Sequence, residues 1–127
     1  MHYPSDLLYS KSHERVALEG TTAHIGVTDY AQDAMGDIVF VNLPSEADEV
    51  VLGESFAELE SVKAVAQAYS PVSGTISAVN ESLLDAPEAI NETPYEAWLI
   101  EVTGISEKEE LLSAEEYQAF LLSLKEE

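Results

Sequence analysis

A single lysine, Lys63, is the residue in this sequence most able to do chemistry. It is one of only 5 Lys and Arg residues, and the acids Glu58 and Glu60 lie just before it. A neutral lysine amine is a good nucleophile for an activated carboxylate, and its long stem carries the resulting amide clear of the surface. Most exposed lysines only add solubility. The residues around Lys63 must therefore show whether it is a site of amide formation or an ordinary surface lysine.

Two extended segments flank Lys63 and predict a β-hairpin with the lysine at its tip. Residues 55–59 lead in, and residues 64–69 lead out toward a Ser-Pro-Val-Ser-Gly segment at 70–74. Short strands bounded by Gly, Pro and Ser are typical of hairpins. The sequence therefore predicts that a turn displays the amine of Lys63.

No other group of residues forms a recognisable catalytic or metal site. The histidines His2, His13 and His24 lack the HExxH spacing of zinc enzymes, and the chain has no cysteine. The acids near 107–110 lack the spacing of a calcium-binding EF-hand, and no serine lies in a nucleophile elbow. We expect a protein that is not an enzyme and holds no metal.

Length and charge narrow the class of protein further. A chain of 127 residues with 46% hydrophobic residues is long enough for one folded domain. Its net charge of -20 disfavours nucleic acid and anionic membranes as partners, and favours a monomer that docks on basic protein surfaces. The absence of a long apolar run and of a signal-peptide pattern predicts a cytoplasmic protein.

The segments around the hairpin predict a mostly β domain with a helical C-terminal end. The predicted strands cover residues 16–18, 23–27, 38–43, 75–79 and 97–102. A short helix through Tyr30, Ala31, Ala34 and Met35 would be capped by Thr28 or Asp29 and stopped by Gly36.

Two capping boxes predict a C-terminal helical tail over 106–125. Ser106 with Glu109, and Ser113 with Glu116, have the spacing of such boxes. An apolar stripe follows and would pack on the sheets; it comprises Ala114, Tyr117, Phe120, Leu121 and Leu124.

The motif around Lys63 resembles that of the H protein of the glycine cleavage system. It reads Glu60-Ser61-Val62-Lys63-Ala64 and is followed by YSPVSG at 69–74 and by PY at 94–95. In that family the lysine carries lipoic acid in amide linkage. The resemblance implies that Lys63 is the covalent lipoyl site and that its recognised flanking residues are Glu60, Ser61, Val62 and Ala64.

The same resemblance implies a fold and a domain plan. It covers nearly the whole chain, so residues 1–127 would form a single lipoyl-carrier domain. The expected fold is the barrel-sandwich hybrid of lipoyl and biotinyl domains, with short helices and a C-terminal helix. The core hairpins would span about 22–104, and the helical tail 106–125.

The family also implies partners. The carrier would take the aminomethyl group of glycine from the P protein, a pyridoxal-phosphate glycine decarboxylase. The T protein, a tetrahydrofolate aminomethyltransferase, would then receive it, and the L protein, dihydrolipoyl dehydrogenase, would reoxidise the lipoyl group. A lipoate-attaching enzyme is a further implied partner.

A second site is implied at the segment before the first long strand. Ser12-His13-Glu14 resembles the segment of H proteins where the loaded lipoyl arm folds into a cleft, and a plain polar start of a strand is the alternative. Gln67 stands where the family commonly has an acid, and Arg15 where it nearly always has tryptophan. Ser12, Glu14 and Gln67 are thus the candidate docking residues.

Two other functions stay open from the sequence. An H-like protein that only relays lipoate to other complexes would share the same motif. A biotin carrier is the other alternative, but such domains usually present Met-Lys-Met, whereas Val62 and Ala64 flank Lys63 here.

Overall fold

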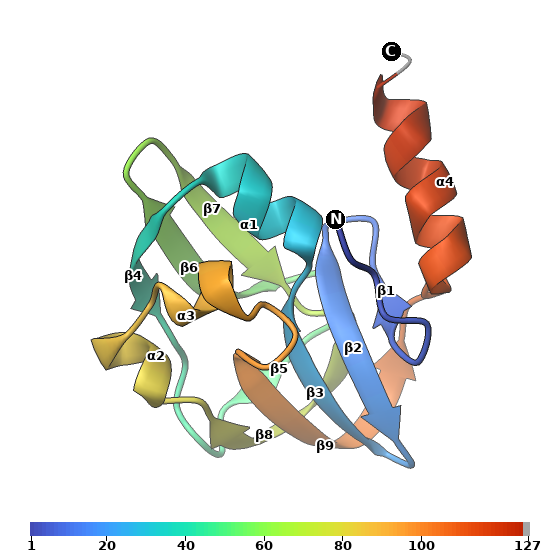
Figure 1. Ribbon diagram of the computed structural model, residues 1–127. Helices are drawn as coiled ribbons and strands as arrows, with labels where there is room; N and C mark the ends of the chain where they lie inside the picture. Colours follow the sequence, from blue (N-terminus) through green and yellow to red (C-terminus); the bar gives the residue numbers. More distant parts are fainter. Residues whose placement is uncertain (126–127) are drawn as a thin grey trace.

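The computed structural model describes residues 1–125 and consists mostly of β-strands in two open sheets (Figure 1). Neighbouring strands pair antiparallel throughout. The larger sheet has the order β1-β2-β3-β9-β8-β5, with β1 (Leu8–Tyr9), β2 (Glu14–Glu19), β3 (Thr22–Val27), β9 (Ile100–Lys108), β8 (Val72–Val79) and β5 (Glu49–Val50). The smaller sheet comprises β4 (Ile38–Asn42), β6 (Ser55–Ser61) and β7 (Val65–Tyr69). The predicted mostly β class and the hairpin around Lys63 are confirmed.

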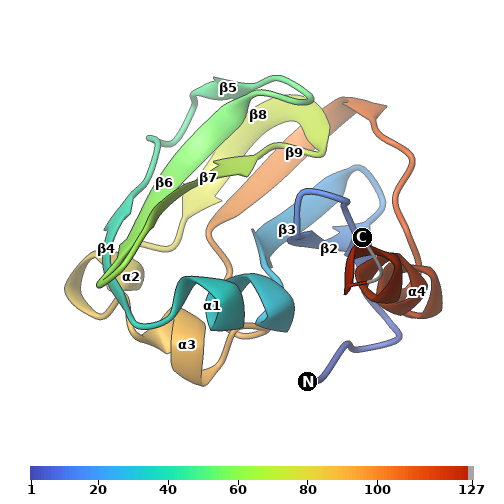
Figure 2. The ribbon, with the colours of Figure 1, turned by 90° about the horizontal axis from the view of Figure 1, so that it is seen from above.

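The hydrophobic core lies between the two sheets, which curve around it (Figure 2). Alternate strand residues point inward, as the period of two requires. The core side chains with less than 2% exposure include Val16 and Ile25 from the larger sheet and Val41 and Leu59 from the smaller one. This shared core fixes the β6–β7 hairpin relative to β2 and β3.

Three short helices cover the open side of the sheets, α1 (Asp29–Met35), α2 (Ser82–Asp85) and α3 (Ala89–Glu92). The hydroxyl of Thr28 accepts a hydrogen bond from the backbone N–H of Ala31, and Gly36 ends α1. These are the predicted cap and stop. Asn91 of α3 donates to the carbonyl of Gly36 at 2.9 Å and fixes the corner between α1 and β4.

The last helix, α4 (Ala114–Lys125), packs on the outside of the larger sheet through a separate aromatic cluster (Figure 1). Tyr117 stacks on Tyr9 of β1 with ring centroids 4.9 Å apart. The capping box at the start of α4 is formed, because Ser113 and Glu116 exchange hydrogen bonds. The predicted apolar stripe therefore packs as expected, against β1 and the N-terminal segment.

The predicted helical tail over 106–125 is wrong in its first part. Ser106 lies in β9, where Glu107 pairs with Ser73 and Lys108 with Val72. This pairing continues the sheet, so the helix starts only at Ala114. The sheet also begins before the predicted core of 22–104, at Leu8.

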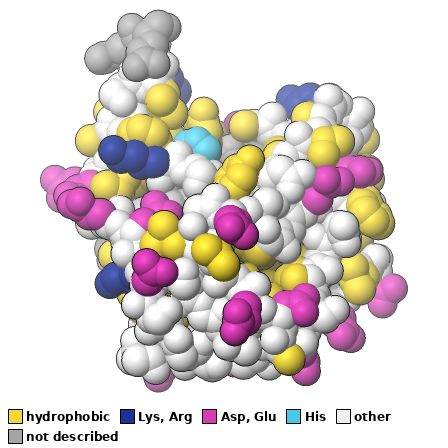
Figure 3. Space-filling view, turned by 180° about the vertical axis from the view of Figure 1, so that it is seen from behind, with side chains coloured by type: hydrophobic (Ala, Val, Ile, Leu, Met, Phe, Trp, Pro, Cys, Tyr) yellow, Lys and Arg dark blue, Asp and Glu magenta, His cyan; other side chains and the backbone are white. Residues whose placement is uncertain are grey.

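Figure 3 shows acidic side chains scattered over the middle and lower parts of one face, with few basic side chains among them. Within residues 1–125, no helix is long and apolar enough to cross a membrane.

Candidate functional site

Lys63 lies in the tight turn that joins β6 to β7, and this turn projects beside the end of α1 (Figure 1). The backbone N–H of Ser61 donates to the carbonyl of Ala64 at 2.8 Å. The hydroxyl of Ser61 accepts from the N–H groups of Lys63 and Ala64, at 3.3 and 3.0 Å. Ser61 therefore fixes the turn from inside and leaves the side chains of Val62 and Lys63 outside it.

The turn rests on the corner between α1 and β4. The backbone N–H of Val62 donates to the carbonyl of Asp37 at 3.1 Å. The stem of Lys63 lies over Gly36, since a Cβ atom built on that glycine would be 3.2 Å from Lys63 Cε. Among the residues that the structure describes, no carboxylate forms an ion pair with the Lys63 amine. Lys63 is exposed.

The acids before Lys63 face its hairpin partner strand. Glu58 accepts a hydrogen bond of 2.8 Å from Gln67 Nε2, directly across the pair. Glu60 lies between the exposed side chains of Phe40 and Val65 in the same cross-strand row. The surface around the lysine is therefore a mixture of acids and exposed apolar groups.

The three predicted docking residues, Ser12, Glu14 and Gln67, line one cleft of about 180 Å³. Its other walls are mostly apolar. They come from the end of β3, from α1 and from the β6–β7 hairpin, and comprise Val27, Tyr30, Ala31, Ala34, Met35, Leu59, Ala66 and Ala68, with His13 beside them. The structure thus places residues 12–14 and 67, which are far apart in the sequence, side by side.

Glu14 is the buried acid of this cleft, with 2% of its surface exposed. Its carboxylate accepts hydrogen bonds from the hydroxyls of Ser10 and Ser12 and from the backbone N–H of Tyr69. Burial raises the pKa of Glu14 to about 7, although the three hydrogen bonds act in the opposite direction. Glu14 therefore ties β2 to β7 and brings a carboxyl group that titrates near neutral pH to the cleft.

His13 joins the cleft to α4. Its backbone has a φ of 76°, and its Nδ1 shares a hydrogen bond of 2.8 Å with the hydroxyl of Tyr117. That hydroxyl also meets Thr28 Oγ1 at 2.9 Å. Burial lowers the pKa of His13, which favours the neutral ring. The spacing of the histidines gave no sign of this role, which depends on the packing of α4.

Arg15 does not line the cleft. Successive strand residues face opposite sides, so Arg15 points away from the side of Glu14. It lies across from Gly26, where a Cβ atom would be 2.8 Å from Arg15 Nε, and Nη2 donates to the carbonyl of Pro94 at 3.2 Å. The Nε atom is buried without a hydrogen-bond partner. The departure at position 15 therefore alters the packing behind β2, not the cleft.

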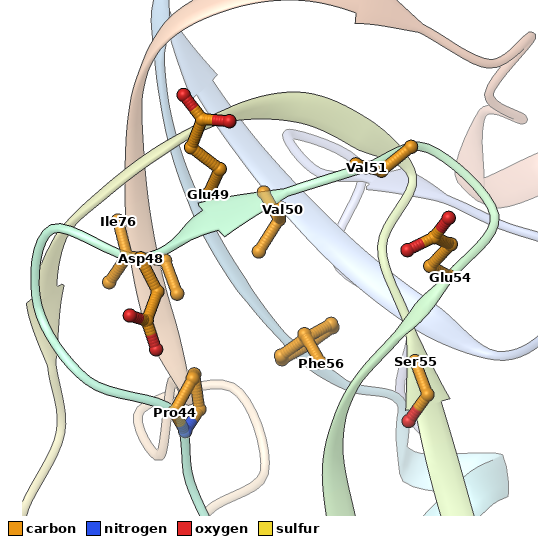
Figure 4. Close-up of a pocket in the computed structure, with 9 residues that line it drawn as sticks. All are labelled: Pro44, Asp48, Glu49, Val50, Val51, Glu54, Ser55, Phe56 and Ile76. Atoms are coloured by element: carbon orange, nitrogen blue, oxygen red, sulfur yellow. The ribbon is translucent and has the colours of Figure 1, made fainter.

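A further hollow of about 330 Å³ lies between β5, the start of β6 and β8 (Figure 4). Val50 and Phe56 face into it, while the carboxylate of Glu49 points away. None of the site residues expected from the sequence lines it. Across residues 1–125, no group of three His, Asp or Glu side chains could hold a metal ion.

Comparisons with known proteins agree with each other. The family model described as glycine cleavage H-protein matches residues 7–124. A glycine cleavage system H protein of Lachnoclostridium phytofermentans is 61% identical over 117 residues, covering 91% of this chain and 92% of that protein. One from Oceanobacillus iheyensis is 52% identical over 124 residues, covering 95% and 98%.

A solved structure gives the same result for the fold. The crystal structure of a glycine cleavage system H protein from Mycobacterium marinum superposes with a TM-score of 0.87 at 38% sequence identity. The match covers 92% of this chain and 97% of the other.

Proposed function

The chain belongs to the glycine cleavage H-protein family, and we propose that it carries lipoic acid on Lys63 as the mobile carrier of that system. The observation that carries the proposal is the exposed amine of Lys63 on a turn that Ser61 fixes, without an ion pair among the described residues. Such an amine fits attack on an activated carboxylate, which would form the amide bond. The attaching enzyme would recognise Glu60, Val62 and Ala64, which flank Lys63.

Bound lipoic acid would supply a pair of sulfur atoms able to accept a one-carbon unit and electrons. The protein's own contribution would be to tether these atoms on a long stem, so that transfers occur at high effective concentration. We propose that the carrier takes the aminomethyl group of glycine from the decarboxylase to the aminomethyltransferase. Dihydrolipoyl dehydrogenase would then reoxidise it.

The cleft next to the hairpin fits the arm between its visits to these enzymes. Its apolar walls suit a hydrocarbon stem and would exclude water. Ser12 and Glu14 line it, and the carboxyl of Glu14 is a natural partner for the ammonium group of the cargo. The side-chain amide of Gln67 instead bonds to Ser55 and Glu58 on the other side of β7. Glu14→Ala should leave lipoylation intact but hasten ammonia release once the carrier has accepted the aminomethyl group.

The direct test of the carrier role is glycine-dependent exchange of carbon dioxide. We expect exchange only when the decarboxylase and this protein bearing lipoate are both present. Unlipoylated protein and Lys63→Arg are the matched controls. Exchange by the carrier alone, or equal exchange with Lys63→Arg, would refute the role. Full lipoylation without support of exchange would favour the lipoate-relay alternative.

A further inference from the structure

Gly36 lies beneath the side chain of Lys63, at the corner where α1 passes into β4. A Cβ atom built on Gly36 would lie 3.2 Å from Cε of Lys63, with Cδ at 3.8 Å and Nζ at 3.7 Å. Cε is the nearest atom, and Cδ and Nζ, which flank it in the side chain, are only slightly farther away. The stem of Lys63 therefore runs across the corner instead of ending on it, and there is room for it because position 36 has no side chain.

The backbone of this corner holds the turn as well as the stem. Gly36 has φ 79° and ψ -158°, a conformation that is essentially restricted to glycine. Its N–H donates to the carbonyl of Gln32 at 3.0 Å, and the carbonyl of Asp37 accepts from the N–H of Val62 at 3.1 Å. The corner is thus anchored to α1 on one side and to the lysine turn on the other.

The same corner adjoins the wall of the cleft. Ala34 and Met35, which directly precede Gly36, line the cleft together with Glu14 and Gln67. Gly36, which the stem crosses, is thus the next residue in the chain after the cleft wall.

We propose that Gly36 is a positioning residue for the lipoyl arm. Its missing side chain leaves the space through which the stem of Lys63 runs from the turn toward the cleft. This inference rests on the proposed attachment of lipoic acid to Lys63. A Cβ atom at position 36 would lie closer to Cε of Lys63 than an ordinary contact, so the stem would shift away from the corner and the arm would lie more often in solvent.

A control must separate this contact from backbone strain, because alanine at position 36 brings both. Gly53 provides it, with a φ of 85° and no atom within 4 Å of a Cβ built on it. Gly53→Ala therefore introduces a strained backbone away from Lys63, and Gly36→Ala adds the obstruction of the stem.

The readout is the reactivity of the reduced lipoyl thiols with N-ethylmaleimide. Since the chain has no cysteine, the reagent reports on the lipoyl group alone. Wild type, Gly36→Ala and Gly53→Ala are lipoylated in full, as checked by intact mass, and then reduced with a phosphine. We expect the thiols of Gly36→Ala to react roughly fourfold faster than in wild type, the factor for exposing about one methylene group. Gly53→Ala should match wild type.

Equal reactivity of the two glycine variants would overturn the positioning role alone, while lipoylation of Lys63 would still stand. Failure of the wild type to accept lipoate would overturn the proposed function and this inference with it. If Gly36→Ala does not fold, wild-type protein suffices. The amide resonance of Gly36 should shift on lipoylation and that of Gly53 should not, and an unchanged Gly36 resonance would overturn the inference.

Discussion

Glu14 is a buried carboxyl group whose ionisation should affect stability. Its pKa rises from 4.5 to about 7 in the folded protein because burial disfavours the charged form. The unfolded chain keeps the ordinary value. The stability that protonated Glu14 contributes is therefore fully present below pH 4.5 and is lost as the pH rises through 7.

Comparison with Glu14→Gln isolates this titration. Relative to the variant, wild type should lose about 3 kcal/mol of unfolding free energy between pH 4.5 and pH 8. Urea unfolding of both proteins across this range measures the difference, and the titration of the other acids cancels. Parallel curves for the two proteins would show that Glu14 ionises normally.

Arg15 should lower the free energy of unfolding, since its Nε atom is buried without a hydrogen-bond partner. A buried unsatisfied donor costs about 1–3 kcal/mol, so Arg15→Met should raise the free energy of unfolding by about that amount. The exposed Lys108→Met is the matched control, because it removes the same charge from a chain of net charge -20. A loss of stability in Arg15→Met beyond that of the control would contradict this prediction.

At the level of single residues, some features could be predicted from the sequence pattern, whereas others depend on packing in the folded chain. The hairpin that displays Lys63 follows from alternation and turn residues, and the family motif pointed to Ser12, Glu14 and Gln67, which line one cleft. The surroundings of Arg15 could not be predicted. They depend on Gly26 lying opposite in the next strand, and a strand register is not readable from one sequence.

Among the elements, α4 should depend on its capping box. Ser113→Ala removes the hydroxyl that accepts from the N–H of Glu116, and should lower the unfolding free energy by about 0.5–2 kcal/mol. Ser106→Ala, at the other apparent capping box, lies exposed in β9 and should change it by less than about 0.5 kcal/mol. Chemical unfolding measures both variants, and equal losses would contradict the assignment of the helix start.

The sequence could not distinguish these two capping boxes because both have the same spacing. What separates them is non-local, namely the pairing of Ser73 with Glu107 and Val72 with Lys108. Helix α1 was predictable because its cap at Thr28 and its end at Gly36 are local signals. The very short elements β5 and α2 have no such signal and appear only in the folded chain.

The whole molecule is an acidic support that would present the proposed lipoyl lysine, Lys63. The chain has a net charge of -20, and acidic side chains are scattered over the face that Figure 3 shows. Like-charged copies should repel each other, whereas basic surfaces on the proposed partner enzymes would attract this chain over a Debye length. The two sheets and α1 hold the lysine turn at one end of this support.

The most direct measurement of the central claim is the mass and position of lipoylation. The full chain is incubated with a lipoate ligase, lipoic acid and ATP, then analysed by intact mass and by peptide mapping. We predict one added lipoyl group, located on Lys63, and none in Lys63→Arg. A modification that persists in Lys63→Arg, or that maps to Lys11, Lys108 or Lys125, would contradict lipoyl attachment at Lys63.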